Sequence, residues 1–219
     1  MIDIDLILSS LPLLLRGARV SLQIAALSAL IGIGFGTLLG LLQSGKNKLL
    51  QYAVGLYVLL VRGTPMLIHI TVAVYVLPQI GIKLPIFWAA LLAIGFNSAA
   101  YVSQIVRSGI ASVSKGQIEA AKTLGLSSFQ ITRYIILPQA LQAVLPALGN
   151  EFITLIKDSS LASIVGVTEL ARQGSLIRSR TFDALSIYLA VAILYLIMTT
   201  SLSLLLYLLE KRLNRHVSS

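Results

Sequence analysis

Ionisable side chains lie at helical spacing inside otherwise apolar stretches of this sequence. Glu151, Thr154 and Asp158 stand at positions i, i+3 and i+7, which places them on one face of a helix. An ionised side chain at the centre of a bilayer costs about 3 kcal/mol, so such residues are expected to bind a ligand or to pair with one another. Glu151 could bind the cationic end of a small molecule. It could equally pair with Arg62 or Lys157 and hold helices together, and the sequence leaves both interpretations open.

Two further polar stripes follow the same spacing in other apolar segments. They comprise Asn97, Tyr101, Gln104 and Ser108 in one segment, and Arg62, Met66 and His69 in another. If the three segments face each other, their stripes form one polar path. His69 alone on an apolar face is more typical of a packed, hydrogen-bonded residue than of a ligand.

The composition shows which solvent this chain is built for. Of its 219 residues 57% are hydrophobic and only 11% are charged, whereas a soluble domain carries about a quarter charged residues. The net charge of +9 could suggest nucleic acid, but Lys and Arg lie singly or in small groups between apolar runs, without an aromatic and basic face. The chain contains no Cys, which excludes disulfides, thiol catalysis and Cys-ligated metals. The sequence therefore predicts an integral membrane protein that binds no nucleic acid.

The spacing of the charges predicts five transmembrane helices in an all-α fold. Each span must provide about 20 apolar residues. One domain, residues 1–219, is predicted to hold an interfacial helix over 5–16, spans at 18–43, 49–78, 84–107, 139–168 and 184–209, and a loop over 110–138. The second span is longer than the bilayer requires and contains Gly63-Thr64-Pro65, so it should bend or break near Pro65.

The distribution of Lys and Arg predicts the orientation. An odd number of spans puts the two ends of the chain on opposite sides. The turn at 45–49, the 107–138 loop and the tail at 211–215 share the more cationic side, which the positive-inside rule places in the cytoplasm. Residues Arg16, Arg19, Lys83, Arg172, Arg178 and Arg180 fall on the other side. The N-terminus is therefore predicted outside and the C-terminus inside.

The 107–138 loop is the one long stretch where the apolar character lapses. Ser114 to Gln117 fits a capping box, and Gly125 suits the left-handed position that ends a helix. Ser127 to Gln130 offers a second start of the same kind. We expect two short helices at a sharp turn on the membrane surface.

The residues of this loop carry a resemblance to a known family. Glu119-Ala120-Ala121, Gly125 and Ile135-Ile136-Leu137-Pro138 reproduce the spacing E-A-A-x(3)-G-x(9)-I-x-L-P. This resembles the signature loop of permease subunits in bacterial ABC importers. Four further segments look like the polar amino acid branch of that family, which includes histidine, glutamine and arginine permeases: 62–65, 101–109, 116–117 and 157–161.

The resemblance implies a type I importer fold, a location in the bacterial inner membrane and a set of partners. The loop would be a coupling helix that docks into a groove on an ATPase subunit, through Ser114, Lys115, Glu119, Ala120, Ala121 and Gly125. The implied partners are a pair of ABC ATPase subunits, a second permease subunit (identical or homologous), an extracytoplasmic amino-acid-binding protein, membrane lipid and the amino-acid substrate. The chain would be a non-catalytic transport subunit without a cofactor, with ATP and Mg²⁺ on the ATPase. Gly40 to Asn47 nearly spells a phosphate-binding loop, but it ends in Asn and follows a transmembrane helix, so we regard it as a chance match.

The substrate predicted from this reasoning is a polar amino acid, of the basic type (arginine, lysine or histidine), moved by alternating access. Its binding residues would be Glu151, Asn150, Asn97, Thr64, Arg62, Met66, Tyr101, Thr154 and Asp158. Glu151 would hold the cationic end, while Asn150, Asn97 and the broken backbone near Thr64 would hold the zwitterionic end. Glutamine or glutamate remains an alternative, as does a secondary transporter without an ATPase. For Asp158 a structural role is also predicted, as the cap of a helix that restarts there.

Two other features allow alternatives. Gly32, Gly36 and Gly40 repeat every fourth residue, which predicts close packing against another helix, either within the chain or between two permeases. The outer segment 169–183 carries three Arg residues and could contact an acidic surface of a binding protein, or be a solvated loop.

Overall fold

The computed structural model describes residues 2–215, with side chains through residue 211. In the described chain every regular element is helical, which confirms the predicted all-α class. The elements are α1 (Ile4–Ser44), α2 (Lys48–Arg62), α3 (Met66–Thr71), the π-helix η1 (Val72–Val76), the 3-10 helix η2 (Leu77–Ile80), α4 (Ile86–Ala111), α5 (Lys115–Thr123), α6 (Ser128–Ile131), the π-helix η3 (Thr132–Ile136), α7 (Leu137–Asp158), the 3-10 helix η4 (Ser159–Val165), α8 (Leu170–Thr181) and α9 (Ala184–Arg215). Part of the cationic tail predicted at 211–215 lies outside the described side chains.

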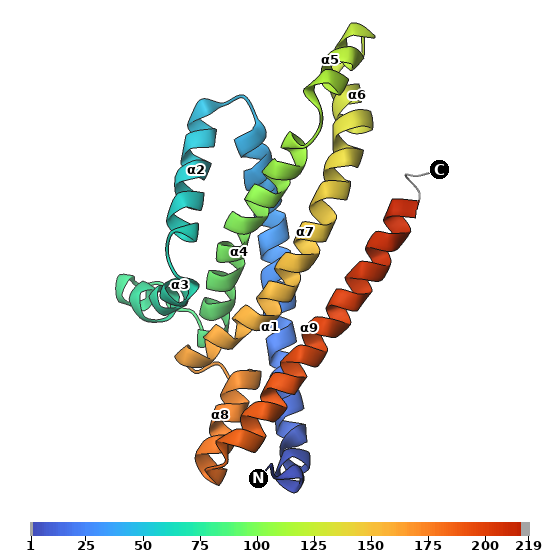
Figure 1. Ribbon diagram of the computed structural model, residues 1–219. Coiled ribbons are helices and arrows are strands. Elements are labelled where there is room, and N and C mark those ends of the chain that lie inside the picture. The colour runs from blue at the N-terminus through green and yellow to red at the C-terminus, as the bar shows by residue number, and fades with distance from the viewer. Residues whose placement is uncertain (1, 216–219) are drawn as a thin grey trace.

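The long helices form an elongated bundle in which α1 packs against α4, α7, α8 and α9. Figure 1 shows α5 and α6 at one end of this bundle, and the N-terminus with α8 at the other end. Among the described residues four helices are long and apolar enough to cross a membrane, and a fifth crossing results if the bent pair Lys48–Arg62 and Met66–Ile80 is one span. The 107–138 loop and the outer segment 169–183, which the sequence assigned to opposite sides of the membrane, thus lie at opposite ends of the bundle.

The glycine stripe of α1 lets another long helix approach closely. A Cβ on Gly32 would meet the Ser98 side chain at 2.6 Å, and one on Gly36 would meet the Ala99 carbonyl oxygen at 2.7 Å. A Cβ on Gly40 would lie 2.7 Å from the Ser103 carbonyl oxygen. The stripe therefore packs against α4 of the same chain, and the intramolecular alternative is confirmed.

The second span breaks where the sequence predicted. Helix α2 ends at Arg62, α3 begins at Met66, and the two axes differ by 98°. Pro65 has no N–H to continue the helical ladder, so carbonyls at the end of α2 need other donors. The Gly63 N–H donates to the Leu59 carbonyl at 2.9 Å, and the Thr64 hydroxyl donates to the Leu60 carbonyl at 2.7 Å.

The predicted interfacial helix at 5–16 is not a separate element. It forms one helix with the first span, the 41-residue α1, whose N-terminus is capped by the Asp3 side chain. Pro12 lies inside this helix without ending it. Gly17 marks a close approach rather than a turn, because a Cβ there would come within 2.8 Å of the Leu170 Cα.

The second of the two predicted surface helices is also part of a longer helix. Helix α6, the π-helix η3, α7 and the 3-10 helix η4 follow one another without a break, so that the apolar helix spans 38 residues from Ser128 to Val165. Pro138 is the second residue of α7, which begins where η3 ends. A π-helical turn changes the register of backbone hydrogen bonds, which lets the chain accept a proline there without ending the helix.

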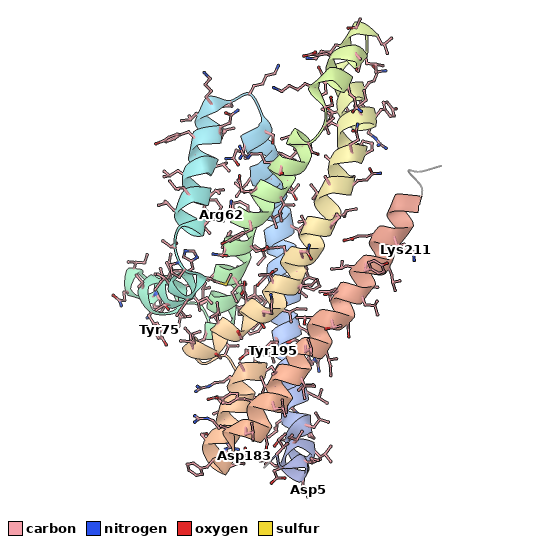
Figure 2. All side chains as sticks on the ribbon, in the orientation of Figure 1. Asp5, Arg62, Tyr75, Asp183, Tyr195 and Lys211 are labelled. Atoms are coloured by element: carbon pink, nitrogen blue, oxygen red, sulfur yellow. The ribbon has the colours of Figure 1, made fainter. Side chains whose placement is uncertain are left out.

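The outer segment 169–183 is a packed helix rather than an open loop. Glu169 is fully buried and caps α8, accepting hydrogen bonds from the backbone N–H groups of Ala171 and Arg172. Its carboxylate also accepts from the hydroxyls of Ser21 at 3.1 Å and Tyr195 at 2.7 Å, which joins α8 to α1 and α9. Figure 2 places Tyr195 on α9 where that helix crosses α1.

The N-terminus is fastened at the same end of the bundle. Ser186 donates two hydrogen bonds to the Asp183 carboxylate, one from its N–H at 2.9 Å and one from its hydroxyl at 2.6 Å. These two bonds lower the pKa of Asp183. The Asp3 N–H in turn donates to the Ser186 hydroxyl, so the start of α1 is held against the start of α9.

The glycine contact predicts a difference between two neighbouring positions of α1. Gly36→Leu should destabilise the protein by about 1–3 kcal/mol, because the side chain has no room against Val102 and Ala99. Gly34→Leu is the matched control, since nothing lies within 4 Å of a Cβ at Gly34. The midpoint of thermal unfolding in detergent measures both variants. Equal midpoints would contradict the close packing of α1 on α4.

Candidate functional site

A polar cavity of about 490 Å³ lies where α2 ends, between α4 and α7. We call it the polar cavity; its lining residues are Arg62, Gly63, Thr64, Pro65, Met66, Asn97, Tyr101, Glu151, Thr154 and Asp158. Every residue that the sequence predicted to bind substrate lines this cavity except Asn150. The three predicted polar stripes therefore do meet, and the binding roles of their residues stay predictions.

Asn150 lies outside the polar cavity. Its side chain is exposed, and its backbone carbonyl accepts a hydrogen bond from the Thr154 hydroxyl at 3.1 Å. Neighbouring residues on a helix point about 100° apart, so Asn150 cannot share the face of Glu151. The same geometry leaves Lys157 out of the cavity lining.

The charges of the polar cavity stand on two walls. Arg62 comes from the end of α2, as Figure 2 shows, and its guanidinium lies 5.0 Å from the centre of the Tyr101 ring. Glu151 comes from α7 and accepts a hydrogen bond from the Ser98 hydroxyl at 2.7 Å. Among the described residues Glu151 forms no ion pair with Arg62 or Lys157, so the purely structural pairing is not present. Glu151 is thus left to interact with whatever enters the cavity.

Asp158 is the second carboxylate of the cavity, and the role as a helix cap is wrong. It precedes η4, but its side chain makes no capping hydrogen bond and lines the polar cavity instead. Sequence reasoning missed Ser98, the partner of Glu151. The sequence could have suggested Ser98, because this polar residue follows Asn97 in an apolar segment. On α4 it lies between the polar stripe and the face that contacts the glycines of α1.

A second cavity of about 370 Å³ continues the polar one towards α5. It shares Arg62, Tyr101 and Glu151 with the polar cavity and adds the side chains of Gln104, Ile105, Ser108, Ser112 and others. From Asn97 to Ser112, α4 lines this path over about 22 Å, at 1.5 Å per residue. The predicted stripe of α4 therefore follows a continuous path, with Arg62, Tyr101 and Glu151 at the junction of its two cavities.

The loop between α4 and α7 has the predicted turn but only one of the two predicted capping boxes. Gly125 adopts a left-handed φ of 77°, and the Leu126 N–H donates to the Ala121 carbonyl at 3.1 Å across the end of α5. Ser127 and Gln130 form the complete capping box of α6.

At the start of α5 the predicted capping box is absent. Ser114 precedes α5 but makes no side-chain capping bond, since the Gln117 N–H donates to the Ser114 backbone carbonyl at 3.1 Å. The Gln117 amide oxygen accepts from the Gln139 side chain at 2.9 Å. This contact fastens α5 to the start of α7.

The outer surface of this loop carries apolar side chains. Leu124 is 80% exposed and Phe129 is 76% exposed, and Glu119 and Ala120 are exposed beside them. Ala121 is buried, so it shapes the turn rather than meeting a partner. Exposed apolar groups rimmed by polar ones are typical of a protein interface.

Comparison with known proteins gives the family of this chain. Residues 32–215 match the family described as binding-protein-dependent transport system inner membrane component. The chain belongs to this family. It is also 38% identical over 213 residues to the glutamine transport system permease protein GlnP of Escherichia coli strain K12, covering 96% of this chain and 97% of that protein. The probable amino-acid ABC transporter permease protein YckA of Bacillus subtilis is 37% identical, with 97% and 94% of the two chains covered.

Solved structures agree with this membership. The crystal structure of an amino acid ABC transporter with histidines shares 36% of the sequence and superposes with a TM-score of 0.92, over 97% of this permease and 99% of that chain. The MetNI methionine ABC transporter, at 22% identity and a TM-score of 0.78, shows the same fold. The permease is thus an amino-acid ABC importer subunit of the type I fold, located in the membrane and without catalytic activity of its own. Membership implies an ATPase and a binding protein as partners.

The turn after α5 predicts a difference between two glycines of the loop. Gly125→Ala should strain the backbone by about 1–2 kcal/mol, because L-residues disfavour φ near 77°. Gly116→Ala is the matched control, since Gly116 lies within α5 and its nearest neighbour, at 3.7 Å, is in ordinary contact. Co-purification with the ATPase subunit should fall several-fold in the first variant only. Unchanged co-purification of Gly125→Ala would show that the ATPase does not depend on this turn.

Proposed function

We propose that this permease carries cationic amino acids into a bacterial cell, with arginine, lysine and histidine as the substrates. The observation that supports this most directly is the composition of the polar cavity, which holds one cation, Arg62, and two carboxylates, Glu151 and Asp158. A zwitterionic amino acid with a cationic side chain carries the complementary set of charges. The volume of the polar cavity, about 490 Å³, suits a small molecule, since binding sites for small molecules measure roughly 300–1,000 Å³.

The proposed pose assigns each charge of the substrate to one wall. The α-carboxylate pairs with the Arg62 guanidinium, which no carboxylate occupies among the described residues. The cationic side chain lies against α7, where the Ser98 bond occupies Glu151 Oε1 and leaves Oε2 available. Thr64 and Asn97 line the cavity between the two walls and supply uncharged polar groups for the α-ammonium.

Transport in this proposal follows from the loop at the far end of the path. ATP and Mg²⁺ bind to a pair of ATPase subunits, whose closure moves α5 through Ser114, Lys115, Glu119, Ala120 and Gly125. Because the Gln117 to Gln139 hydrogen bond connects α5 to α7, that motion reaches the helix that bears Glu151 and Asp158. A second permease subunit completes the translocation path. The cavities are then open to each side of the membrane in turn.

The orientation in this proposal puts the loop in the cytoplasm and the N-terminus outside. Figure 1 shows these two parts at opposite ends of the bundle, as the charge distribution requires. The exposed Arg178 and Arg180 of α8 then face the extracytoplasmic binding protein. The alternative of a secondary transporter loses its support, because the family works with an ATPase.

Glutamine is a second candidate substrate, and the relatives favour it. GlnP of Escherichia coli, at 38% identity, is a glutamine permease by name. Glutamine has the same zwitterionic end but a neutral side chain, so it would use Arg62 and leave both carboxylates of the cavity without a cation.

The substrate panel that decides between these candidates uses the reconstituted complex. We expect ATPase activity with the binding protein to rise with arginine, lysine or histidine, and to stay near the basal rate with the other amino acids. All twenty amino acids are tested in the same proteoliposomes. Stimulation by glutamine alone would overturn the cationic substrate and keep the amino-acid permease.

Replacing Glu151 tests the proposed pose. Glu151→Gln keeps the hydrogen bond from Ser98 but removes the charge, so arginine uptake should fall about tenfold or more. Asp5→Asn is the matched control, because Asp5 is an exposed carboxylate at the other end of the bundle. Uptake of radiolabelled arginine into proteoliposomes measures both variants. If Glu151→Gln transports arginine at the normal rate, Glu151 is not a ligand.

A further inference from the structure

Three side chains at the broken second span are joined by hydrogen bonds: Thr64 and Asn97, which line the polar cavity, and His69, which does not. The Asn97 amide nitrogen lies 3.0 Å from His69 Nδ1. His69 Nε2 lies 2.5 Å from the Thr64 hydroxyl oxygen, and that hydroxyl lies 2.7 Å from the Leu60 carbonyl. This series of hydrogen bonds thus connects α4 to the end of α2 through His69 of α3.

The direction of these bonds follows from counting donors. A hydroxyl has one proton, and Thr64 donates it to the Leu60 carbonyl, so Thr64 must accept from His69 Nε2. Neutral His69 therefore carries its single proton on Nε2, and its Nδ1 is an acceptor. The Asn97 amide nitrogen is the donor that faces this acceptor. The direction of each hydrogen bond thus determines that of the next, and Asn97, His69, Thr64 and the Leu60 carbonyl each have a partner.

The amide oxygen of Asn97 is consequently turned away from His69. Asn97 is 4% exposed and lines both the polar cavity and a neighbouring apolar cavity of about 420 Å³, whereas His69 lines only the apolar one. No buried side-chain oxygen or nitrogen of the described residues lacks a hydrogen-bond partner. The Asn97 oxygen has no such partner within the described chain, so it reaches open space rather than the packed interior.

We propose that His69 is a positioning residue that turns the Asn97 amide oxygen into the polar cavity, where it accepts a hydrogen bond from the α-ammonium group of the amino-acid substrate. The inference rests on the proposed function and adds a specific role to it. His69 touches no substrate. It acts through Asn97. The Thr64 hydroxyl, which accepts from His69, also donates to the Leu60 carbonyl that the helix break leaves without a backbone donor.

This arrangement makes Asn97 selective for a donor. If the amide were turned around, its two N–H groups would face the cavity and oppose an ammonium ion. With the nitrogen held by His69, only the acceptor is presented. A hydrogen bond from a charged group is stronger than a neutral one, so the orientation matters most for the ammonium of an amino acid.

A double-mutant cycle on uptake tests this role. His69→Leu removes both hydrogen bonds and should raise the KM for radiolabelled arginine about tenfold, with kcat changed less than twofold. His69→Gln should stay within about twofold of the wild type in KM, because its amide offers one acceptor and one donor side by side. In an Asn97→Ala background His69→Leu should add no further increase in KM. That lack of additivity is the readout that a merely structural histidine would not give.

The outcomes separate this inference from the proposed substrate. If the wild-type protein takes up glutamine and not arginine, the same cycle is measured with radiolabelled glutamine, whose α-ammonium group is identical. His69→Met replaces His69→Leu should the latter fail to assemble with the ATPase. Independent effects of the His69 and Asn97 substitutions on KM would overturn the positioning role, as would a fall in kcat at constant KM. Wild-type uptake in the same vesicles remains the test of the proposed function.

Discussion

The close approach of α1 to α4 is the contact on which the rest of the structure depends. Glycines on one face of α1 let the α4 backbone come so near that a single Cβ would collide with Ser98, Ala99 or Val102. In lipid there is little hydrophobic gain from joining two apolar helices, so such contacts through small residues supply much of the association. With one face of α4 fixed against α1, its polar stripe can only face α2 and α7. The position of the polar path is therefore a consequence of where the glycines are.

The second constraint is that backbone groups within the membrane must find partners inside the protein. The break at Gly63 to Pro65 opens the end of α2 beside the cavity, where an exposed carbonyl would be costly in hydrocarbon. Thr64 satisfies the Leu60 carbonyl, and in doing so becomes an acceptor for His69. The break thereby brings Arg62, Thr64 and Met66 to the cavity wall, and the Thr64 hydroxyl replaces the missing backbone donor. The irregular backbone and the proposed ligand site coincide because both require polar surroundings.

Much of the site could be predicted from sequence because polar residues in apolar helices have few reasons to be there. Helical spacing alone grouped Glu151 with Asp158 and Asn97 with Tyr101, and all four line the polar cavity. The errors arose where two features compete for the same residue. Asn150 was included for its amide, although its position one step from Glu151 turns it away.

The boundaries of the helices were harder to predict than their faces. The start of α1 carries Pro12 and Gly17, both usual signs of an interruption. The fully buried contacts of α8 hold the helix straight through them, and those contacts involve residues some 150 positions away. Similarly, Ser127 to Gln130 does begin a helix, but the π-helical turn that carries it through Pro138 into α7 leaves no mark in the local pattern. Long-range packing decides where such helices begin and end, and the local sequence pattern carries no information about that packing.

Family membership and cavity chemistry answer different parts of the question of substrate. Relatives of nearly equal identity are named for different ligands: GlnP, at 38%, for glutamine, and the nopaline transport system permease NocM of Agrobacterium fabrum, at 37%. Overall similarity therefore cannot select the ligand. We propose that the walls of the cavity can, because the charges of the half-buried Glu151 and Asp158 need a counterpart. In the proposed pose Arg62 pairs with the α-carboxylate that every amino acid has, which leaves Glu151 and Asp158 to distinguish one side chain from another. In this proposal a neutral side chain would leave the charges of these two half-buried carboxylates uncompensated, whereas a guanidinium or ammonium group would compensate them directly.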